Sequence, residues 1–481
     1  MTQADIYYKA VLARDPRFDR KFFIGVKTTG IYCRPICPAE PKRRNVEFFS
    51  IALLAEKSGY RPCLRCRPES APMSPAWIGK SAVVQRALKL MARQSSIDQG
   101  EEQFASLFGV SARHLRRLFE GELGRTPKQI ADQNRLNFAR KLITETALPM
   151  TDVGYASGFK SLRRFNDAVR VRFHRSPSEI RALSGAKRES DGIVLHLSYR
   201  PPLDWHSLMT FYRSHAIRPV ETVTDDVYSR VFKMEGVVGS LQVCQSQNER
   251  ELILSITIDD SRGIFAIVQR VRNMFDLECD PIHISNVFSG CPLMKKLGAK
   301  HPGLRLPRGF DPFETSICTI LGQLVSTEHA KILIQQLVEI YGEKIRNPFT
   351  GGEASLFPTA RVLATESLVE IKTTRAGREA IREFSRLVLE KQIRLDATQD
   401  PNAFRDRVVR IKGIGPWTAQ YISLRAIGDT DAFPATDLIL RRVLENQSTL
   451  DLECLKPWRA YAAIYLWKEY ARTLSNKKRS P

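Results

Sequence analysis

The sequence predicts a multidomain α+β protein, and three observations support this fold class. The chain has 481 residues, whereas a single hydrophobic core stops growing at about 250–300 residues. Four cysteines lie within 34 residues near the amino terminus. Apolar residues follow helical spacing in the middle and near the end of the chain, with short β-rich runs between those two regions. We therefore expect a small α/β domain over 1–75, an all-α domain over 81–185, an α+β subdomain over 192–305 and an all-α domain over 306–475.

The composition is that of a globular protein, with 43% hydrophobic and 26% charged residues. No apolar run reaches the roughly 18 residues of a membrane span. Asp5, Lys9 and Arg14 interrupt the segment where a signal peptide needs an apolar stretch. We therefore expect a soluble cytoplasmic protein without a membrane partner.

The positive charge is concentrated in the first part of the chain. The net charge is +22, and residues 1–190 carry 35 Lys and Arg against 18 Asp and Glu, a balance of +17. Such an excess predicts a polyanionic partner, foremost nucleic acid. A solvated basic surface without any partner is the alternative, and charge alone leaves it open.

The first four cysteines have the spacing of a metal site, Cys33-x3-Cys37 and Cys63-x2-Cys66. Two short chelating loops can close a tetrahedral tetrathiolate shell, so we expect one zinc ion per chain. The spacing leaves a purely structural zinc open, and it does not say which thiolate would react. The other cysteines show no pairing and are expected to be small buried hydrophobes; they are Cys244, Cys279, Cys291, Cys318 and Cys454.

Residues 22–35, FFIGVKTTGIYCRP, and 59–66, GYRPCLRC, resemble the amino-terminal domain of Ada-type proteins, and the resemblance covers about residues 3–70. It implies that all four cysteines bind zinc and that the first, Cys33, irreversibly accepts a methyl group from a methylated DNA phosphate. The chemistry is consistent, because zinc keeps a thiol deprotonated at neutral pH and the thiolate is the nucleophile. A methyl phosphotriester is also uncharged, so the nucleophile does not approach a full negative charge.

Residues 104–119 have the pattern of a helix-turn-helix. One helix is expected to end at Gly109, and Ser111 can cap the next. The second helix presents Arg113, Arg116 and Arg117 on its polar side, where they could reach phosphates or base edges. A helical hairpin with a solvated basic face is the alternative. The sequence GRTP at 124–127 recurs as HRSP at 174–177, and each copy is expected to close a helical unit.

A second unit at 153–165 contains Arg163 and Arg164. The two units and the segment joining them resemble the AraC/XylS family over about residues 81–185. The resemblance implies major-groove binding to double-stranded DNA, transcriptional activation, and RNA polymerase as a further partner.

After a polar linker at 184–192, β-rich runs appear at 193–197, 237–243 and 252–258, and the pattern is mostly helical from Asp311. In residues 410–419, Gly413-x-Gly415 permits a tight turn whose backbone N–H groups can meet a phosphate beside the helix that starts near Pro416. Alone, this helix-hairpin-helix pattern is more often an ordinary helix connection. Asp437, some twenty residues further on, is by itself a typical helix-start carboxylate.

Taken together with residues 305–314 and 320–326, these features resemble the AlkA-type 3-methyladenine-DNA glycosylases over about residues 192–470. The resemblance implies that Asp437 is the catalytic carboxylate and that Trp417 and Tyr421 are aromatic walls of the base pocket. It also implies that Leu324 is the wedge that replaces a flipped nucleotide and that the hairpin glycines contact DNA. As an alternative, the three apolar side chains could simply belong to the core.

The implied chemistry matches these residue types. An N3- or N7-alkylated purine is cationic and already a good leaving group, so a carboxylate need only stabilise an oxocarbenium-like sugar while aromatic faces attract the base. Related lyases carry a lysine where Trp417 stands, so a Schiff base and strand cleavage are not expected. Only Cys454 follows Asp437, which argues against a four-cysteine iron–sulfur cluster.

Together, these resemblances identify the chain as a member of the Ada/AlkA fusion type, which implies an adaptive-response alkylation repair protein of the bacterial cytosol and nucleoid. We expect it to be monomeric. It departs from longer Ada proteins because no cysteine precedes a histidine, so O6-alkylguanine repair is not expected. The rival hypothesis is a non-enzymatic AraC-type transcription factor with structural zinc and a degenerate glycosylase fold that only grips DNA.

Overall fold

A computed structural model describes residues 2–15, 18, 22–35, 37, 39–50, 52–63, 68, 82–93, 100–184, 192–234, 236–248, 250–396, 399–445 and 452–477. The chain forms two compact units, Met1–Arg188 and Glu189–Pro481, and each is described by itself. The finer boundaries within them, near residues 75–81 and 305, stay predictions. No helix in the described part is long and apolar enough to cross a membrane.

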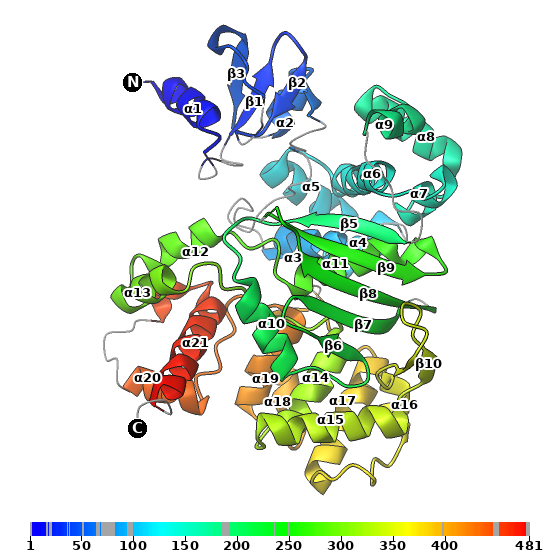
Figure 1. Cartoon of the computed structure of the whole chain (residues 1–481), viewed down its shortest axis with the longest axis vertical. Coiled ribbons are helices and arrows are strands. Elements are labelled where there is room, and N and C mark those ends of the chain that lie inside the picture. The colour runs from blue at the N-terminus through cyan, green and yellow to red at the C-terminus, as the bar shows by residue number, and fades with distance from the viewer. Residues whose placement is uncertain are drawn as a thin grey trace. The chain divides into compact units, whose positions relative to one another are not determined.

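The zinc subdomain, residues 2–63, is built on a small mixed sheet (Figure 1). Its elements are α1 (Gln3–Leu12), β1 (Phe23–Val26), β2 (Ile31–Cys33), β3 (Val46–Phe49), α2 (Ala52–Lys57) and β4 (Arg61–Pro62). The strand order is β3-β1-β2-β4; β1 is antiparallel to β2 and β3, while β2 runs parallel to β4.

The central strand β1 is buried along its whole length, because each face of the sheet has its own core. Ile24 and Val26 belong to the core that includes Ala10 and Val11 of α1. Phe23 belongs to the opposite core. The short β1–β2 connection and the β2–β4 pairing bring cysteines that are distant in sequence to one end of the sheet.

The helix-turn-helix subdomain lies within residues 82–184, and its described residues, 82–93 and 100–184, contain helices and no strands, as predicted. Its elements are α3 (Ala82–Arg93), α4 (Glu101–Ser106), α5 (Ala112–Leu123), α6 (Pro127–Glu145), α7 (Met150–Ala156), α8 (Leu162–Phe173) and α9 (Pro177–Leu183). The pairs α4–α5 and α7–α8 are the two helix-turn-helix units, and α6 joins them. Ser111 caps α5 by accepting from the His114 N–H, as expected. However, α4 ends at Ser106, earlier than predicted, and Gly109 lies in the turn with φ +71°.

The repeated four-residue sequence closes one helix and starts the next in both copies. Gly124 ends α5 with φ 64°, and Thr126 caps α6 in a capping box. His174 ends α8 with φ 54°, and Ser176 caps α9 in the same way. In both copies a proline occupies the first helical turn, where its missing N–H has no helical partner to lose.

The second unit begins with a five-stranded antiparallel sheet of order β5-β9-β8-β7-β6. Its elements are β5 (Ile193–Ser198), α10 (Trp205–Ser214), β6 (Glu221–Val223), β7 (Val227–Met234), β8 (Val237–Gln245), β9 (Glu251–Ile258) and α11 (Ile264–Met274). The three predicted β-rich runs correspond to β5, β8 and β9. β5 alternates buried and partly exposed side chains, which is the pattern of a strand with one face on a core.

In the rest of this unit, the described residues form helices and one small β-hairpin. Its elements are α12 (Pro281–Phe288), α13 (Pro292–Lys300), α14 (Pro312–Gly322), α15 (Thr327–Tyr341), β10 (Lys344–Arg346), β11 (Glu353–Ser355), α16 (Ala360–Thr365), α17 (Arg375–Leu389), α18 (Pro401–Val409), α19 (Pro416–Ile422), α20 (Leu438–Glu445) and α21 (Arg459–Lys477). A π-helical turn, Ser423–Ile427, continues α19.

Two hydrophobic cores hold these helices. Helices α14, α15 and α17–α19 share one core, and α12, α13, α20 and α21 share the other. Ile422 and Ala426 belong to the first core, whereas Leu424 belongs to the second. The segment that continues α19 is therefore fixed from both sides.

The expectation that all remaining cysteines are buried is wrong for Cys454, which is exposed. Cys279 and Cys291 are buried, and Cys244 and Cys318 are half-buried. Cys454 lies in a single 3₁₀ turn, Glu453–Leu455, in which Leu455 is the residue that faces the core.

Candidate functional site

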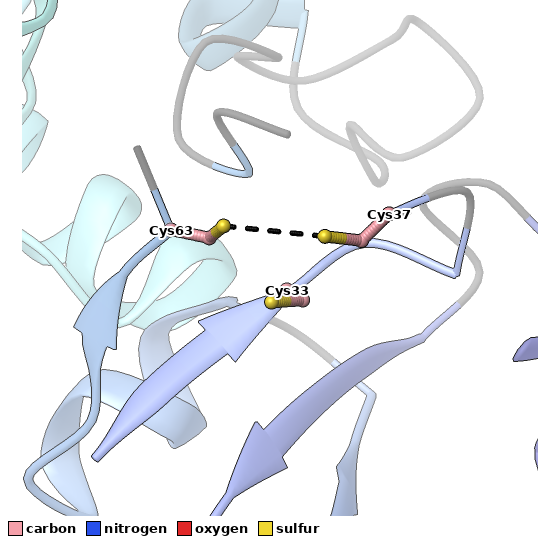
Figure 2. A group of neighbouring side chains, drawn as sticks. All are labelled: Cys33, Cys37 and Cys63. Carbon is pink, nitrogen blue, oxygen red and sulfur yellow. Dashed lines mark hydrogen bonds between the residues drawn. The ribbon is translucent and has the colours of Figure 1, made fainter. Parts of the chain in front are cut away.

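Three of the four predicted zinc ligands lie together at one end of the amino-terminal sheet (Figure 2). The Sγ atoms of Cys33, Cys37 and Cys63 all lie within 4.8 Å of one another, and those of Cys37 and Cys63 are 4.0 Å apart. Cys33 is the last residue of β2, and the Cys63 N–H donates to Tyr32 O at 3.0 Å. Cys66 lies outside the described residues.

The cluster fits a tetrahedral zinc site. With Zn–S bonds of about 2.3 Å, the sulfurs of such a site are about 3.8 Å apart, close to the separation of Cys37 and Cys63. All three thiols are buried, with Cys37 the least exposed. Cysteines gathered this closely without a disulfide are the donor set that zinc prefers.

The predicted DNA-contacting arginines lie on the second helix of each helix-turn-helix unit. Arg113 and Arg117 of α5 are exposed, as are Arg163 and Arg164 of α8. Arg116 is also exposed but forms an ion pair with Glu101 of α4. A phosphate would therefore have to compete with Glu101 for Arg116.

A carboxylate that sequence reasoning missed connects the zinc subdomain to both helix-turn-helix units. Glu56 of α2 forms ion pairs with Arg125, just after α5, and with Arg172 of α8 at 2.6 Å. It also accepts from the Tyr32 hydroxyl at 2.7 Å. We call Glu56, Tyr32, Arg125 and Arg172 the Glu56 clasp. Glu56 and Arg172 of the clasp line a cleft that basic side chains of the helical subdomain also line, including Lys128, Arg135, Lys160 and Arg164.

Burial by itself would raise the pKa of Glu56, but the hydrogen bond and charge of Arg172, and the charge of Arg125, outweigh it and lower the pKa. The carboxylate is therefore charged at neutral pH. No sequence motif marks Glu56, because its partners in the clasp come from β2, from the turn after α5 and from α8, which are far from α2 in the chain.

In the second unit, Asp437 is the centre of a dense hydrogen-bond network. Its Oδ2 accepts from Trp417 Nε1 at 3.0 Å, and its Oδ1 accepts from Trp467 Nε1 at 3.0 Å. The N–H groups of Ile439 and Leu440 also donate to Oδ1, at 3.0 and 3.1 Å. Asp437 thus caps α20, as the simplest reading of the sequence suggested, and two indoles also fix its orientation.

The aromatic residues predicted to form the base pocket lie beside this carboxylate. Trp417 and Tyr421 stack with ring centroids 5.0 Å apart and planes 13° apart. Trp467 contacts Tyr421 edge-on at 6.0 Å. Sequence reasoning missed Trp467, whose place in the apolar pattern of α21 is also typical of a core residue.

Leu324, predicted to be the wedge, is exposed and has a left-handed backbone conformation. Its side chain is fully exposed, at 103%, and its φ is +62°, which is unfavourable for a residue with a Cβ. The preceding Gln323 donates to Gly413 O at 2.8 Å and accepts from the Thr418 hydroxyl at 2.9 Å. Gln323 thereby fixes the Leu324 loop to the hairpin.

The turn between α18 and α19, which we call the hairpin and which contains Gly413 and Gly415, requires its first glycine. Gly413 has φ +92°, and a Cβ there would lie 3.2 Å from Ala376 O. At Gly415 a Cβ would meet nothing within 4 Å, so the backbone before α19 is open to approach by a ligand.

Family models match three parts of the chain. The metal binding domain of Ada matches residues 6–69, a helix-turn-helix domain matches 104–182, and the AlkA N-terminal domain matches 194–311. These matches agree with the zinc cluster, the two helix-turn-helix units and the five-stranded sheet.

Known proteins similar to the chain cover nearly all of it. It is 34% identical over 474 residues to a probable bifunctional transcriptional activator/DNA repair enzyme AlkA of Mycobacterium tuberculosis, covering 96% of this chain and 95% of that protein. It is 28% identical to DNA-3-methyladenine glycosylase 2 of Escherichia coli over 56% of this chain and 95% of that protein. It is also 39% identical to the E. coli Ada enzyme over 26% of this chain and 34% of that protein. The chain therefore belongs to the Ada/AlkA family, whose members join an Ada-type zinc domain and a DNA-binding transcriptional activator to a DNA glycosylase.

Proposed function

We propose that the second unit hydrolyses the N-glycosidic bond of cationic alkylated purines in double-stranded DNA, such as 3-methyladenine, without strand cleavage. The observation that carries the proposal is the Asp437 carboxylate held by two indoles beside the stacked pair Trp417 and Tyr421. In this proposal Leu324 fills the space left by the flipped nucleotide, and the backbone at Gly413 and Gly415 holds the DNA.

The reaction needs little from the protein besides charge and position. The C1′–N bond breaks and its electron pair leaves with the cationic base, which departs neutral. The fixed negative charge of Asp437 stabilises the positive sugar that remains. Water then adds to C1′ and gives up a proton, leaving an abasic site. Trp417 stands where a Schiff-base lysine would be needed, so no covalent enzyme–DNA adduct forms.

The test is base release from methylated duplex DNA by the wild type, Asp437→Asn and Asp437→Ala. Asparagine caps helices about as well as aspartate, so Asp437→Asn removes the charge and retains the cap of α20. We expect it to lose most of the excision rate while DNA binding is retained, and Asp437→Ala to lose stability as well. A wild type that releases no base would favour the rival hypothesis, in which the protein is a non-enzymatic transcription factor and the glycosylase fold only binds DNA. Borohydride trapping of an enzyme–DNA adduct would contradict hydrolysis without strand cleavage.

We further propose that Cys33, Cys37, Cys63 and Cys66 together bind one zinc ion and that Cys33 accepts a methyl group from a DNA methyl phosphotriester. Bound zinc would keep the thiols deprotonated. Cys33 Sγ attacks the methyl carbon, the C–O bond breaks, and the phosphodiester leaves as an anion. The thioether formed on Cys33 is stable, so each chain reacts once.

Metal analysis and mass spectrometry test this second activity. We expect one zinc per chain, lost when Cys63→Ser and Cys66→Ser are combined. Incubation with methyl-phosphotriester DNA should add one methyl group, located on Cys33 by peptide mapping. An unchanged metal content in the double variant, or a methyl group on another cysteine, would contradict the assignment.

For the helix-turn-helix subdomain, we propose promoter binding through Arg113, Arg116 and Arg117 of the first unit and Arg163 and Arg164 of the second. A monomer that activates transcription by contacting RNA polymerase in the bacterial cytoplasm is the arrangement most consistent with two such units in one chain. Sedimentation of the purified protein tests the oligomeric state, and in vitro transcription tests the contact with polymerase.

A further inference from the structure

Behind the aromatic pair lies an arginine to which no role has yet been given. Arg425 belongs to the π-helical turn Ser423–Ile427 that directly continues α19. Such turns are rare and frequently occur at functional sites. The guanidinium carbon of Arg425 lies 5.7 Å from the ring centroid of Tyr421 and 4.5 Å from that of Phe211 in α10.

Arg425 is thereby the middle of a layered arrangement of side chains. On one side, Tyr421 stacks on Trp417. On the other, Phe211 stacks on His215 with centroids 4.1 Å apart and planes 18° apart. We call His215, Phe211, Arg425, Tyr421 and Trp417 the Arg425 stack. It joins the sheet subdomain to the aromatic residues beside Asp437.

The charge of Arg425 is not neutralised by an ion pair. Its Nε donates to Pro307 O at 2.8 Å, and its Nη1 lies 3.5 Å from the Tyr421 hydroxyl. Among the described residues, no carboxylate lies within 4.0 Å of the guanidinium. By contrast, the buried Arg230 pairs with both Glu221 and Glu314, and Arg405 pairs with Asp429.

The other titratable member of the stack does not add charge. Burial, and then the charge of Arg425, lower the pKa of His215 to about 4, so the imidazole of His215 is uncharged at neutral pH. The stack therefore carries a single positive charge, which lies beside the ring and the hydroxyl of Tyr421.

We propose that Arg425 is a specificity-determining residue that favours excision of neutral damaged bases over cationic ones; this inference rests on the proposed glycosylase function. In both kinds of substrate the base gains one negative charge as the C1′–N bond breaks, and the guanidinium assists that change equally. A cationic base beside Tyr421, however, carries one more positive charge than a neutral base at every stage from binding to the transition state, so the guanidinium lowers the second-order rate constant of the cationic substrate relative to that of the neutral one. Any effect of Arg425 on the positive sugar is common to both kinds of substrate and cancels in the ratio of their rates.

The size of the effect follows from Coulomb's law. For a base about 7 Å from the guanidinium, removing the charge changes the rate ratio roughly threefold at a dielectric of 80 and roughly fiftyfold at 20. The half-buried position of Arg425 favours a value between these limits.

The test compares two second-order rate constants of base release by the full chain, measured under single-turnover conditions with the enzyme in excess over DNA but below saturation. One duplex carries 7-methylguanine, which is cationic in DNA, and the other carries neutral hypoxanthine at the same position. Arg425→Met removes the charge but keeps an unbranched chain between the two rings, and Arg425→Lys is the matched control that keeps the charge. Should Arg425→Met fail to fold, Arg425→Gln serves as the second neutral variant.

We expect the ratio of 7-methylguanine to hypoxanthine release to rise threefold to fiftyfold in the neutral variant and to change little in Arg425→Lys. Equal losses on both substrates would overturn the inference, since they indicate only a role in packing. A wild type that releases 7-methylguanine but no hypoxanthine overturns it too. A wild type that releases neither base instead contradicts the proposed function itself.

Discussion

At the scale of single residues, the candidate glycosylase site was predictable where a local motif marks the residue and not elsewhere. Asp437 and Trp417 lie in short recognisable segments, and the structure brings them into contact. Trp467 and Arg425 carry no such mark. Each acts through contacts with residues of other elements, Asp437 for Trp467 and Phe211 for Arg425, and a single sequence contains no record of those contacts.

We predict that Trp467→Phe slows base excision roughly 10- to 100-fold, because a hydrogen bond to a charged group contributes about 1.5–3 kcal/mol. The substitution removes the Nε1–H donor to Asp437 Oδ1 while a ring remains beside Tyr421. Single-turnover base release measures the rate, and thermal unfolding checks that the fold is retained. A rate equal to that of the wild type would mean that the remaining donors suffice to orient the carboxylate.

At the scale of secondary structure, capping signals predicted several helix starts well. Ser111, Asp437 and the repeated four-residue sequence each cap a helix through hydrogen bonds to residues only two or three positions further on, so a short stretch of sequence contains the whole signal. The end of α4 was misplaced because Gly109 serves the turn rather than the helix end. The π-helical turn was not predictable, because it depends on two cores that hold Ile422 and Leu424 in different directions.

His174 should be suboptimal for its position, which leads to a second prediction. A left-handed backbone costs a residue with a Cβ about 1–2 kcal/mol, while glycine loses about 0.5–1 kcal/mol of unfolded-chain entropy. His174→Gly should therefore stabilise the end of α8 by about 0.5–1 kcal/mol. The equivalent Gly124→Ala is the matched control and should be destabilising. Amide hydrogen exchange in α5, α8 and α9 measures both; slower exchange after Gly124→Ala would contradict the argument.

The Glu56 clasp gives a pH-dependent prediction. The pKa of Glu56 is lower in the folded protein than its ordinary value of 4.5. Its stabilising contribution is therefore fully present above that value and is lost as the pH falls through the folded pKa. Glu56→Gln should weaken the clasp by about 2–4 kcal/mol at neutral pH.

Hydrogen exchange of α2 and α8 at several pH values tests this. The difference between the wild type and Glu56→Gln should be large near neutral pH and should vanish in acid. A difference that is independent of pH would show that packing, rather than charge, holds these elements together.

At the scale of the whole molecule, the order of the parts was predictable because each part has its own sequence motif and because the net charge differs between the first and the second part of the chain. Residues 1–190 carry +17 of the net charge of +22, and the zinc cluster and both helix-turn-helix units lie among them. The clasp, by contrast, was not predictable, since Tyr32, Glu56, Arg125 and Arg172 share no local pattern.

A final prediction couples repair to gene control through charge. If Cys33 accepts a methyl group as proposed, one negative thiolate charge is removed from the site that would contact the DNA phosphates. For one phosphate about 7 Å away, the free energy of promoter binding becomes more favourable by roughly 0.6 kcal/mol at a dielectric of 80 and by roughly 2.4 kcal/mol at 20. These values correspond to about threefold to fiftyfold in affinity.

Salt should reduce this gain. Titration of promoter DNA with protein before and after reaction with methyl-phosphotriester DNA, at two salt concentrations, measures it. Equal affinities at low salt, with Cys33 shown to be methylated, would leave the zinc subdomain as a repair site only.

The position of Tyr32 gives the clasp a thermodynamic consequence. Tyr32 precedes Cys33 in the chain, and its hydroxyl holds the carboxylate that also holds Arg172 of α8. Two binding sites that share one such connection obey reciprocity: the factor by which a ligand at one site changes the affinity of the other site is returned unchanged. If the clasp couples the cysteine cluster to DNA binding by α8, then methyl-phosphotriester DNA at the cluster and promoter DNA at the helix-turn-helix units change each other's affinity by one common factor. This exchange ends when the methyl group is transferred, because the thioether on Cys33 is stable, and the record of the damage then stays in the chain whether or not the promoter is bound.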